Sequence, residues 1–103
     1  MAMTWWKTGV GRMGFEEIAI GGTATVQADT GEIWKIINIF HSGGITLRMV
    51  DADGNSAEYH TTADEAGSLE FLNIQLQDSD HSWLEIDNDN AAANTIMVDA
   101  IVW

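Results

Sequence analysis

Acidic and amide side chains gather in one turn-like stretch of this chain, where they are candidates for metal chemistry. Asp51, Asp53 and Asn55 alternate along the run DADGN, and carboxylate and amide oxygens are the ligands that Ca²⁺ prefers. The spacing departs from an EF-hand loop, because Gly54 is the fourth residue counted from Asp51 and the twelfth is Thr62 instead of glutamate. Asp and Asn are also ordinary residues of tight turns, so we predict a turn here and no metal.

The three histidines, His41, His60 and His81, lie far apart in the sequence. A cupin-type metal site needs two histidines one residue apart on one strand, and the sequence has no such pair, no His-Glu-x-x-His and no Gly-x-Ser-x-Gly element. Adjacent carboxylates such as Glu16 and Glu17 point to opposite faces of a strand, whereas a glycosidase needs two that face each other. We therefore expect a protein that is not an enzyme and uses no cofactor.

Aromatic side chains are the other groups suited to recognition. Trp83 is expected on the polar side of a short strand with Glu85 and Asp87, which suits either a sugar-stacking platform flanked by carboxylates or a contact between subunits. We favour the subunit contact. Phe71, on the polar side of its segment, and Trp103, at the end of the last one, are further candidates for an oligomer interface.

The first fourteen residues differ in kind from the rest of the chain. Their only charged residues are Lys7 and Arg12, whereas all sixteen acids lie further along. They also contain Trp5, Trp6 and three glycines, which disfavour a regular element. Two interpretations stay open: a flexible arm that binds a partner through these tryptophans and cations, since aromatic residues and Arg are enriched at interfaces, or an edge strand that closes the core.

The overall composition limits the class of protein. A 103-residue chain that is 46% hydrophobic forms one domain with a core, despite a net charge of -12. That charge repels phosphate backbones, so we expect no direct nucleic-acid partner. The absence of cysteine excludes disulfides and thiolate metal sites. No signal-peptide pattern opens the sequence and no apolar run is long enough to cross a bilayer, so we expect synthesis in a cytoplasm and no membrane contact.

The segment Ile33–Phe40 is the element around which we expect the others to pack. Six of its eight residues are large and apolar, and they fall on both parities of a strand. A strand covered on one face would alternate between apolar and polar residues. The pattern therefore predicts a central strand that is buried on both faces.

Seven further segments have strand-like patterns between Gly, Asp and Asn turns. They are Met13–Ile20, Thr23–Ala28, Ile45–Asp51, Ser56–Thr61, Leu69–Gln77, Ser82–Asp87 and Thr95–Trp103. The Asp-Gly pair at residues 53–54 is a strong turn signal and predicts a hairpin between Ile45–Asp51 and Ser56–Thr61. About eight strands without a helical period predict an all-β, single-domain antiparallel β-sandwich, jelly-roll-like, with an N-terminal arm over residues 1–14 and the sandwich over 15–103. A small closed barrel is the alternative.

Three segments share a pattern with a known class of protein. They are Gly-Glu-x-Trp-x-Ile-x-Asn-Ile at 31–39, Leu-Asn-Ile-Gln-Leu at 72–76 and Trp-Leu-Glu-Ile at 83–86. In an acidic, cysteine-free β-sandwich of this length, these segments resemble the small virion proteins of tailed bacteriophages, and more narrowly capsid decoration or cement proteins. The resemblance spans residues 22–103, and small phage tail and fibre modules share the same style.

The resemblance implies a homo-oligomer, with a trimer favoured, that binds the major capsid protein on the outside of a phage head and stabilises the shell. Such a protein is assembled in the host cytoplasm and ends up on the virion surface. The arm residues would then dock on the capsid protein, and many weak sites on one shell would act together. The alternative is a carbohydrate- or receptor-binding module of a tail or fibre, with Trp83 and its neighbouring acids as the contact.

Overall fold

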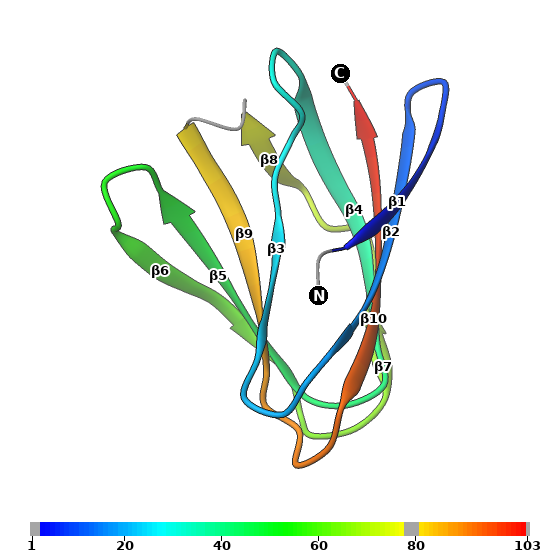
Figure 1. Cartoon of the computed structure of the whole chain (residues 1–103), viewed down its shortest axis with the longest axis vertical. Helices are drawn as coiled ribbons and strands as arrows, with labels where there is room; N and C mark the ends of the chain where they lie inside the picture. The colour runs from blue at the N-terminus through cyan, green and yellow to red at the C-terminus, as the bar shows by residue number, and fades with distance from the viewer. Residues whose placement is uncertain (1–2, 78–80, 103) are drawn as a thin grey trace.

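A computed structural model of the chain describes residues 3–77 and 81–102, and this part contains ten strands (Figure 1). Their bounds are β1 (Thr4–Thr8), β2 (Gly11–Ile18), β3 (Thr23–Val26), β4 (Ile33–His41), β5 (Ile45–Asp51), β6 (Ser56–Thr61), β7 (Gly67–Leu69), β8 (Ile74–Gln77), β9 (Ser82–Asn88) and β10 (Asn94–Val102).

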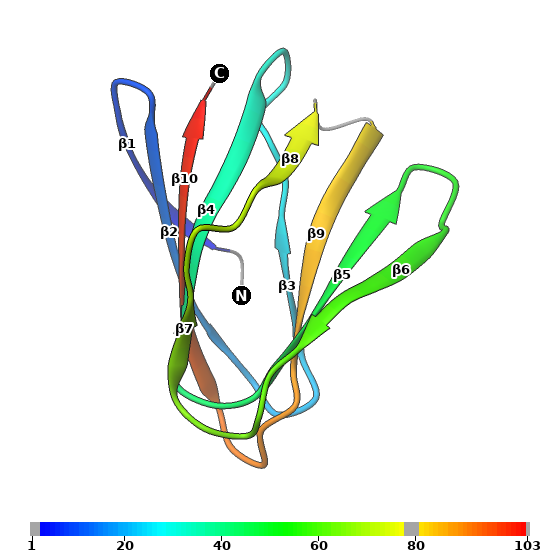
Figure 2. The same cartoon turned by 180° about the vertical axis from the view of Figure 1, so that it is seen from behind.

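The strands form two antiparallel sheets that face each other, as Figures 1 and 2 show from opposite sides. Sheet A has the order β1-β2-β10-β4-β7, with β8 also paired to β4, and sheet B has the order β3-β9-β5-β6. With β1 set aside and β7 and β8 counted as one interrupted strand, the first strand pairs with the last, the second with the next to last, and so on inward. This pairing is that of a jelly roll, so the predicted all-β sandwich is confirmed.

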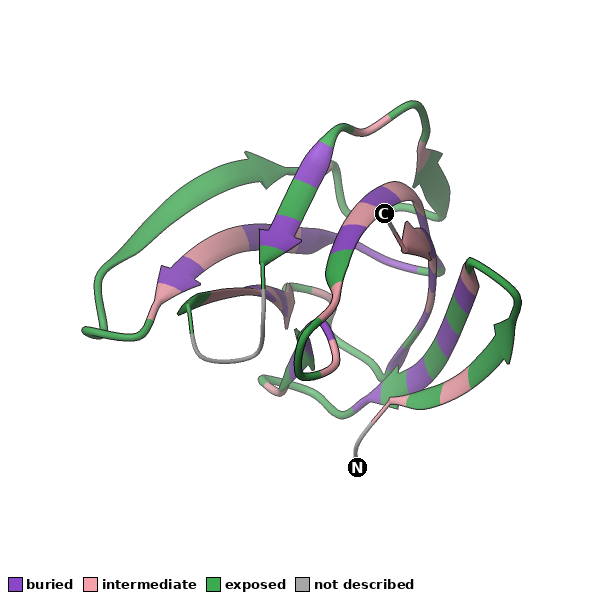
Figure 3. Ribbon diagram, turned by 90° about the horizontal axis from the view of Figure 1, so that it is seen from above, coloured by how far each residue is buried: buried purple, intermediate pink, exposed green. Residues whose placement is uncertain are grey.

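The core lies between the sheets because buried and exposed residues alternate along the strands (Figure 3). Alternate side chains of a strand point to opposite faces, so each strand contributes every second residue to the core. Among the described residues the fully buried large side chains are Trp34, Ile36, Ile39, Ile45, Leu47, Leu76, Leu84, Ile86, Ile96, Val26, Val98 and Asn94.

The strand β4 is central in sheet A, as predicted, but it is not buried on both faces. It pairs with β10 on one side and with β7 and β8 on the other. On the outer face Ile33 is 38% exposed and Phe40 is half-buried. The prediction of two covered faces is therefore wrong.

A β-bulge explains why the sequence of β4 is apolar on both parities. Asp99 of β10 pairs with Asn38, but the next residue, Ala100, pairs with Ile36, so Ile37 is an extra residue. A bulge of this kind reverses which residues point inward. The inward positions are therefore even before the bulge and odd after it, and one covered face uses both parities.

One predicted strand is divided in the structure, and one predicted hairpin is observed with its bounds. The segment predicted from Leu69 to Gln77 is split into β7 and β8, because Phe71 adopts a left-handed backbone conformation with φ of 57°. The predicted β5–β6 hairpin is confirmed with its bounds, and Gly54 supplies the positive φ of 86° that its turn requires.

The structure places the N-terminal segment in sheet A instead of in a separate arm. The strand β1 pairs with β2 along its whole length, and β2 runs through the predicted boundary at residue 14. Gly14 allows this packing, because a Cβ there would lie 2.8 Å from the Trp5 ring. Of the two interpretations of this segment, the edge strand is the one that the structure contains.

Candidate functional site

The outer face of sheet A carries large apolar side chains in register across neighbouring strands. Phe15 pairs with Met97, and Met97 pairs with Phe40; one row further along, Trp6 pairs with Met13. The rings of Trp6 and Phe15 meet edge to face with centroids 5.2 Å apart. We call this surface the apolar face and define it by Trp6, Met13, Phe15, Phe40, Met97 and Ile101.

The apolar face is accessible and carries little charge. Trp6 is 55% exposed, and Met13 and Phe15 are about 40% exposed. One cation and two carboxylates occupy the outward positions of the sheet A strands among the described residues, namely Lys35, Glu17 and Asp99. The face is therefore nearly neutral in a chain whose net charge is -12, and contiguous apolar patches of this kind usually mark interaction sites.

A hollow of about 330 Å³ lies on the apolar face. Phe15, Phe40 and Met97 line it together with His41, Ser42, Ile96 and, at its rim, Thr95 and Ala66. This volume is at the lower end of the range for ligand pockets in proteins.

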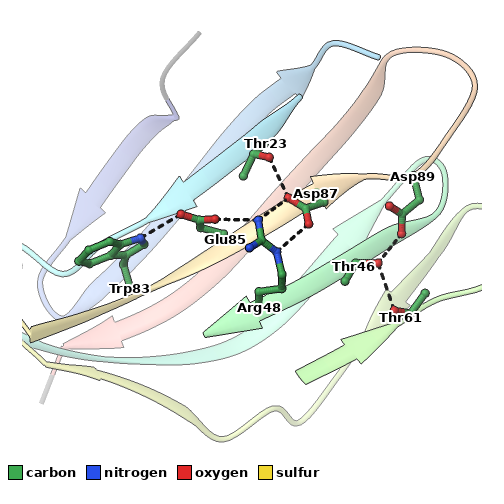
Figure 4. A network of polar contacts seen from close by, with 8 residues as sticks. All are labelled: Thr23, Thr46, Arg48, Thr61, Trp83, Glu85, Asp87 and Asp89. Carbon is green, nitrogen blue, oxygen red and sulfur yellow. Dashed lines mark hydrogen bonds and ion pairs between the residues drawn. The ribbon is translucent and has the colours of Figure 1, made fainter. Parts of the chain in front are cut away.

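The outer face of sheet B is polar and is organised around Arg48 (Figure 4). The guanidinium of Arg48 donates to both carboxylate oxygens of Asp87, at 2.8 and 3.1 Å, and to Glu85 at 2.8 Å. Thr23 donates to Asp87 at 2.8 Å, and the indole Nε1 of Trp83 donates to Glu85 at 3.2 Å. We call this surface the polar face and define it by these five residues.

The ion pairs of the polar face shift the protonation of its groups. The hydrogen bond from Arg48 lowers the pKa of Asp87 below its ordinary value, and the same bond raises the pKa of Arg48. Both groups are therefore held in their charged forms. Their hydrogen-bonding capacity is largely used within the face.

The four residues predicted to form a partner-binding arm do not act together. Trp5 points inward and packs edge to face on Trp34, with ring centroids 4.9 Å apart. Arg12 is buried, 3.3 Å from a carboxylate oxygen of Glu32. Trp6 alone of the four points outward on the apolar face.

Lys7, the remaining arm residue, forms an ion pair with Asp29 in the loop between β3 and β4. Side chains alternate along an edge strand, so Trp6 points to the opposite face from Trp5, and Lys7, which pairs with Arg12, lies on the side of Trp5. The prediction that these four residues form one partner-binding group is therefore wrong. Deleting residues 1–12 would uncover the core, and it would not test docking.

The three residues predicted for an oligomer interface lie in different places. Trp83 is half-buried on the polar face, and Val50, its partner on β5, is only 8% exposed. Phe71 is 89% exposed at the interrupted edge of sheet A. Trp103 lies outside the described residues. Phe71 is thus the most accessible large apolar side chain of the described part.

The turn residues behave as the turn hypothesis predicts. The carboxylate of Asp51 accepts hydrogen bonds from the backbone N–H groups of Asp53 and Asn55 at 3.0 and 2.9 Å, and the side-chain bond from Asn55 lowers its pKa. Within residues 3–77 and 81–102, no group of three or more His, Cys, Asp or Glu residues is placed to hold a metal ion. The same residues contain no helix that is long and apolar enough to span a membrane.

The sequence analysis missed a buried asparagine that closes one end of the sandwich. The Oδ1 atom of Asn94 accepts hydrogen bonds from Ser42 N, Ser42 Oγ and Gly43 N, at 3.0 to 3.2 Å. Its Nδ2 donates to the carbonyl of Gly44 and to Asn88 Oδ1. In the sequence this residue stands in a polar loop among other asparagines, and nothing there distinguishes it.

No family model matches the sequence, and no curated protein matches it. Solved structures with a similar fold include a family 29 carbohydrate-binding module, CBM29-2, complexed with mannohexaose: 8% identity, TM-score 0.56, 99% of this chain and 77% of that one covered. The same module complexed with cellulohexaose gives 9% identity, a TM-score of 0.55 and coverage of 99% and 76%.

The Drosophila melanogaster CENP-C cumin domain is also similar, with 9% identity, a TM-score of 0.50 and coverage of 98% of this chain and 72% of that one. At these identities the likeness shows the fold alone. The chain therefore has a β-sandwich fold that is also found in carbohydrate-binding modules.

Proposed function

We propose that this chain is a non-catalytic, homo-oligomeric structural protein that decorates the outer surface of a tailed-bacteriophage capsid. The observation that carries the proposal is the apolar face, where Trp6, Met13 and Phe15 are exposed on a nearly neutral, regular sheet surface. Large apolar side chains left in water on one contiguous face favour association with another protein surface.

The energetics of the apolar face suit a subunit that binds in many copies. Burying a large apolar side chain completely contributes about 1.5 to 3 kcal/mol, and the three exposed residues are already covered in part. Each contact is then modest, and the many equivalent sites of one shell raise the overall affinity. The acids elsewhere on the chain keep decorated particles apart.

The sequence resemblance supports the capsid as the surface that is bound. Its first segment, residues 31–39, corresponds to the turn before β4 and to β4 itself. This strand contributes Phe40 to the apolar face. The first two segments of the resemblance thus lie in or beside the sheet that carries the proposed contact, and the third, residues 83–86, lies in β9 of sheet B.

Co-sedimentation with purified empty heads of the phage that encodes the chain tests the proposal. Wild type is expected to pellet with heads, whereas Met13→Glu, which puts a charge in the centre of the apolar face, should bind at least tenfold more weakly. Tyr59→Glu is the matched control, because Tyr59 is 50% exposed on β6 of the opposite sheet. Failure of wild type to bind would refute the capsid proposal, and normal decoration by Met13→Glu would refute the assignment of the face.

A second candidate function is carbohydrate binding through the polar face. It is favoured by the fold, which is that of a module complexed with mannohexaose and cellulohexaose, and by the position of Trp83 beside Glu85 and Arg48. It ranks second because these groups already bond to one another, so a sugar would have to displace existing contacts.

Calorimetric titration with mannohexaose and with cellulohexaose tests the second candidate. Binding that is lost in Trp83→Ala but kept in Trp6→Ala, which alters the opposite face, would support it. No heat of binding with either sugar, together with a negative glycan array, would reject it.

A further inference from the structure

Phe71 combines two features that the fold does not require. Its backbone is left-handed, with φ of 57°, a conformation that bulky residues rarely adopt and that glycine adopts readily. Its side chain is 89% exposed and contributes nothing to the core. A strained position that presents an aromatic ring to water points to a contact outside the chain.

Polar contacts hold this strained position. The N–H of Phe71 donates to Asn38 Oδ1 at 3.3 Å, and the N–H of Leu72 donates to the carbonyl of Ile37 at 2.8 Å. Asn38 is fixed in turn by a bond from its Nδ2 to Asp99 at 3.2 Å. The bulge residue of β4 and its neighbour thus anchor the loop between β7 and β8, and the loop presents Phe71 at the edge of sheet A.

The hollow on the apolar face has the chemistry to receive such a ring. Phe15, Phe40 and Met97 line its apolar wall, and sulfur and aromatic edges are favourable neighbours of a phenyl group. Phe40 lies two residues from Asn38 on β4, so ring and hollow belong to the same region of sheet A.

We propose that Phe71 of one copy inserts into the Phe15–Phe40–Met97 hollow of a second copy and so holds the homo-oligomer together. The inference rests on the proposed function, because it names the partner of part of the apolar face. A second copy is the occupant because the chain carries both halves of the contact. Two chains of net charge -12 repel each other, and the repulsion is weakest where the nearly neutral apolar face is turned toward the partner, with Glu65 and Glu70 as the exposed acids beside the contact.

The contact joins different surfaces of the two copies, because the ring and the hollow lie at different positions on one chain. A knob and a hollow at different positions on one chain produce a closed ring when the rotation between copies closes. A buried aromatic anchor seated in a pocket is the usual place where binding energy concentrates. The strain at Phe71 is then offset by the contact.

Sedimentation equilibrium over a concentration series tests the inference with two variants that damage opposite halves of the contact. Phe71→Gly removes the ring and suits the positive φ, so it should be monomeric, with a melting temperature no lower than that of wild type at concentrations low enough to dissociate the wild type. Ala66→Trp adds a large side chain at the rim of the hollow and should also be monomeric. Tyr59→Gly removes a half-exposed aromatic ring from the opposite sheet and should leave the oligomeric mass unchanged.

Mixing the two monomeric variants supplies a second readout. Phe71→Gly retains an intact hollow and Ala66→Trp retains an intact ring, so the mixture should form a species of two-chain mass. A monomeric wild type, an unchanged mass in Phe71→Gly, or no pairing in the mixture would overturn the inference. If Phe71→Gly keeps the oligomeric mass of wild type while Met13→Glu loses binding to heads, the inference is refuted and the proposed function is not. If wild type is oligomeric but does not bind heads, the proposed function is refuted and the inference is not.

Discussion

Replacing Asn94 with alanine should destabilise the sandwich strongly, although the residue touches neither outer face. The substitution removes five hydrogen bonds to Ser42, Gly43, Gly44 and Asn88. Four of the partner atoms keep a second hydrogen bond, so each lost bond costs about 0.5 kcal/mol. The buried N–H of Gly43 is left without a partner, which costs about 1 to 3 kcal/mol. The expected loss is therefore about 3 to 5 kcal/mol.

Urea unfolding followed by tryptophan fluorescence measures this loss directly. Asn73→Ala is the matched control, because Asn73 is an exposed asparagine and its replacement should change stability by less than about 0.5 kcal/mol. A loss for Asn94→Ala as small as that of the control would refute the view that Asn94 holds this end of the sandwich.

Three further predictions follow from single contacts. Gly14→Ala should cost about 1 to 3 kcal/mol, because its Cβ would lie 2.8 Å from the Trp5 ring. Arg48→Met should raise the pKa of Asp87. In wild type the pKa of Asp87 is lowered on folding, so the stability that the ion pair contributes is present above about pH 4 and is lost as the pH falls below it. Burial raises the pKa of Glu16, so Glu16→Gln should be more stable than wild type at neutral pH and equally stable at about pH 3.

Each of these predictions has a direct check. Unfolding of Gly14→Ala with wild-type stability would contradict the packing of β1 on β2. A carboxyl titration followed by NMR should show the Asp87 midpoint move upward in Arg48→Met, and an unchanged midpoint would refute the ion pair. For Glu16→Gln, a stability difference that does not vary with pH would exclude burial of the charge as the cause.

The positions of strands along the chain could be predicted from the sequence wherever a strand has one buried face. The β5–β6 hairpin follows from alternation and an Asp-Gly turn, and both are local signals. The two-layer fold follows from the number and spacing of such strands. The sequence does not show which strands pair, because pairing depends on contacts between distant segments.

The errors arose where local patterns have two structural solutions. An apolar run on both parities fits a doubly buried strand, but it also fits a strand with one covered face and a bulge, as at Ile37. Closely spaced glycines fit a flexible arm, but Gly14 is instead the position over which the Trp5 ring packs. Propensity carries no information on which of these solutions the rest of the chain selects.

The candidate site was predicted in part. The sequence places Phe71 on the polar side of its segment, and its side chain is exposed, but its left-handed backbone has no sequence signal. The apolar face joins residues from four strands, including Phe40 and Met97, and it becomes visible only once the register is known. For the same reason Arg48 and its carboxylate partners could not be grouped from the sequence.

Hydroxyl-radical footprinting of the full chain, free and bound to phage heads, tests most directly which face the protein uses. We expect the labelling of Trp6 and Met13 to fall sharply on binding, because the apolar face becomes covered, while Trp83 and Tyr59 on sheet B keep their reactivity. Protection of Trp83 with no change at Trp6 and Met13 would contradict the account.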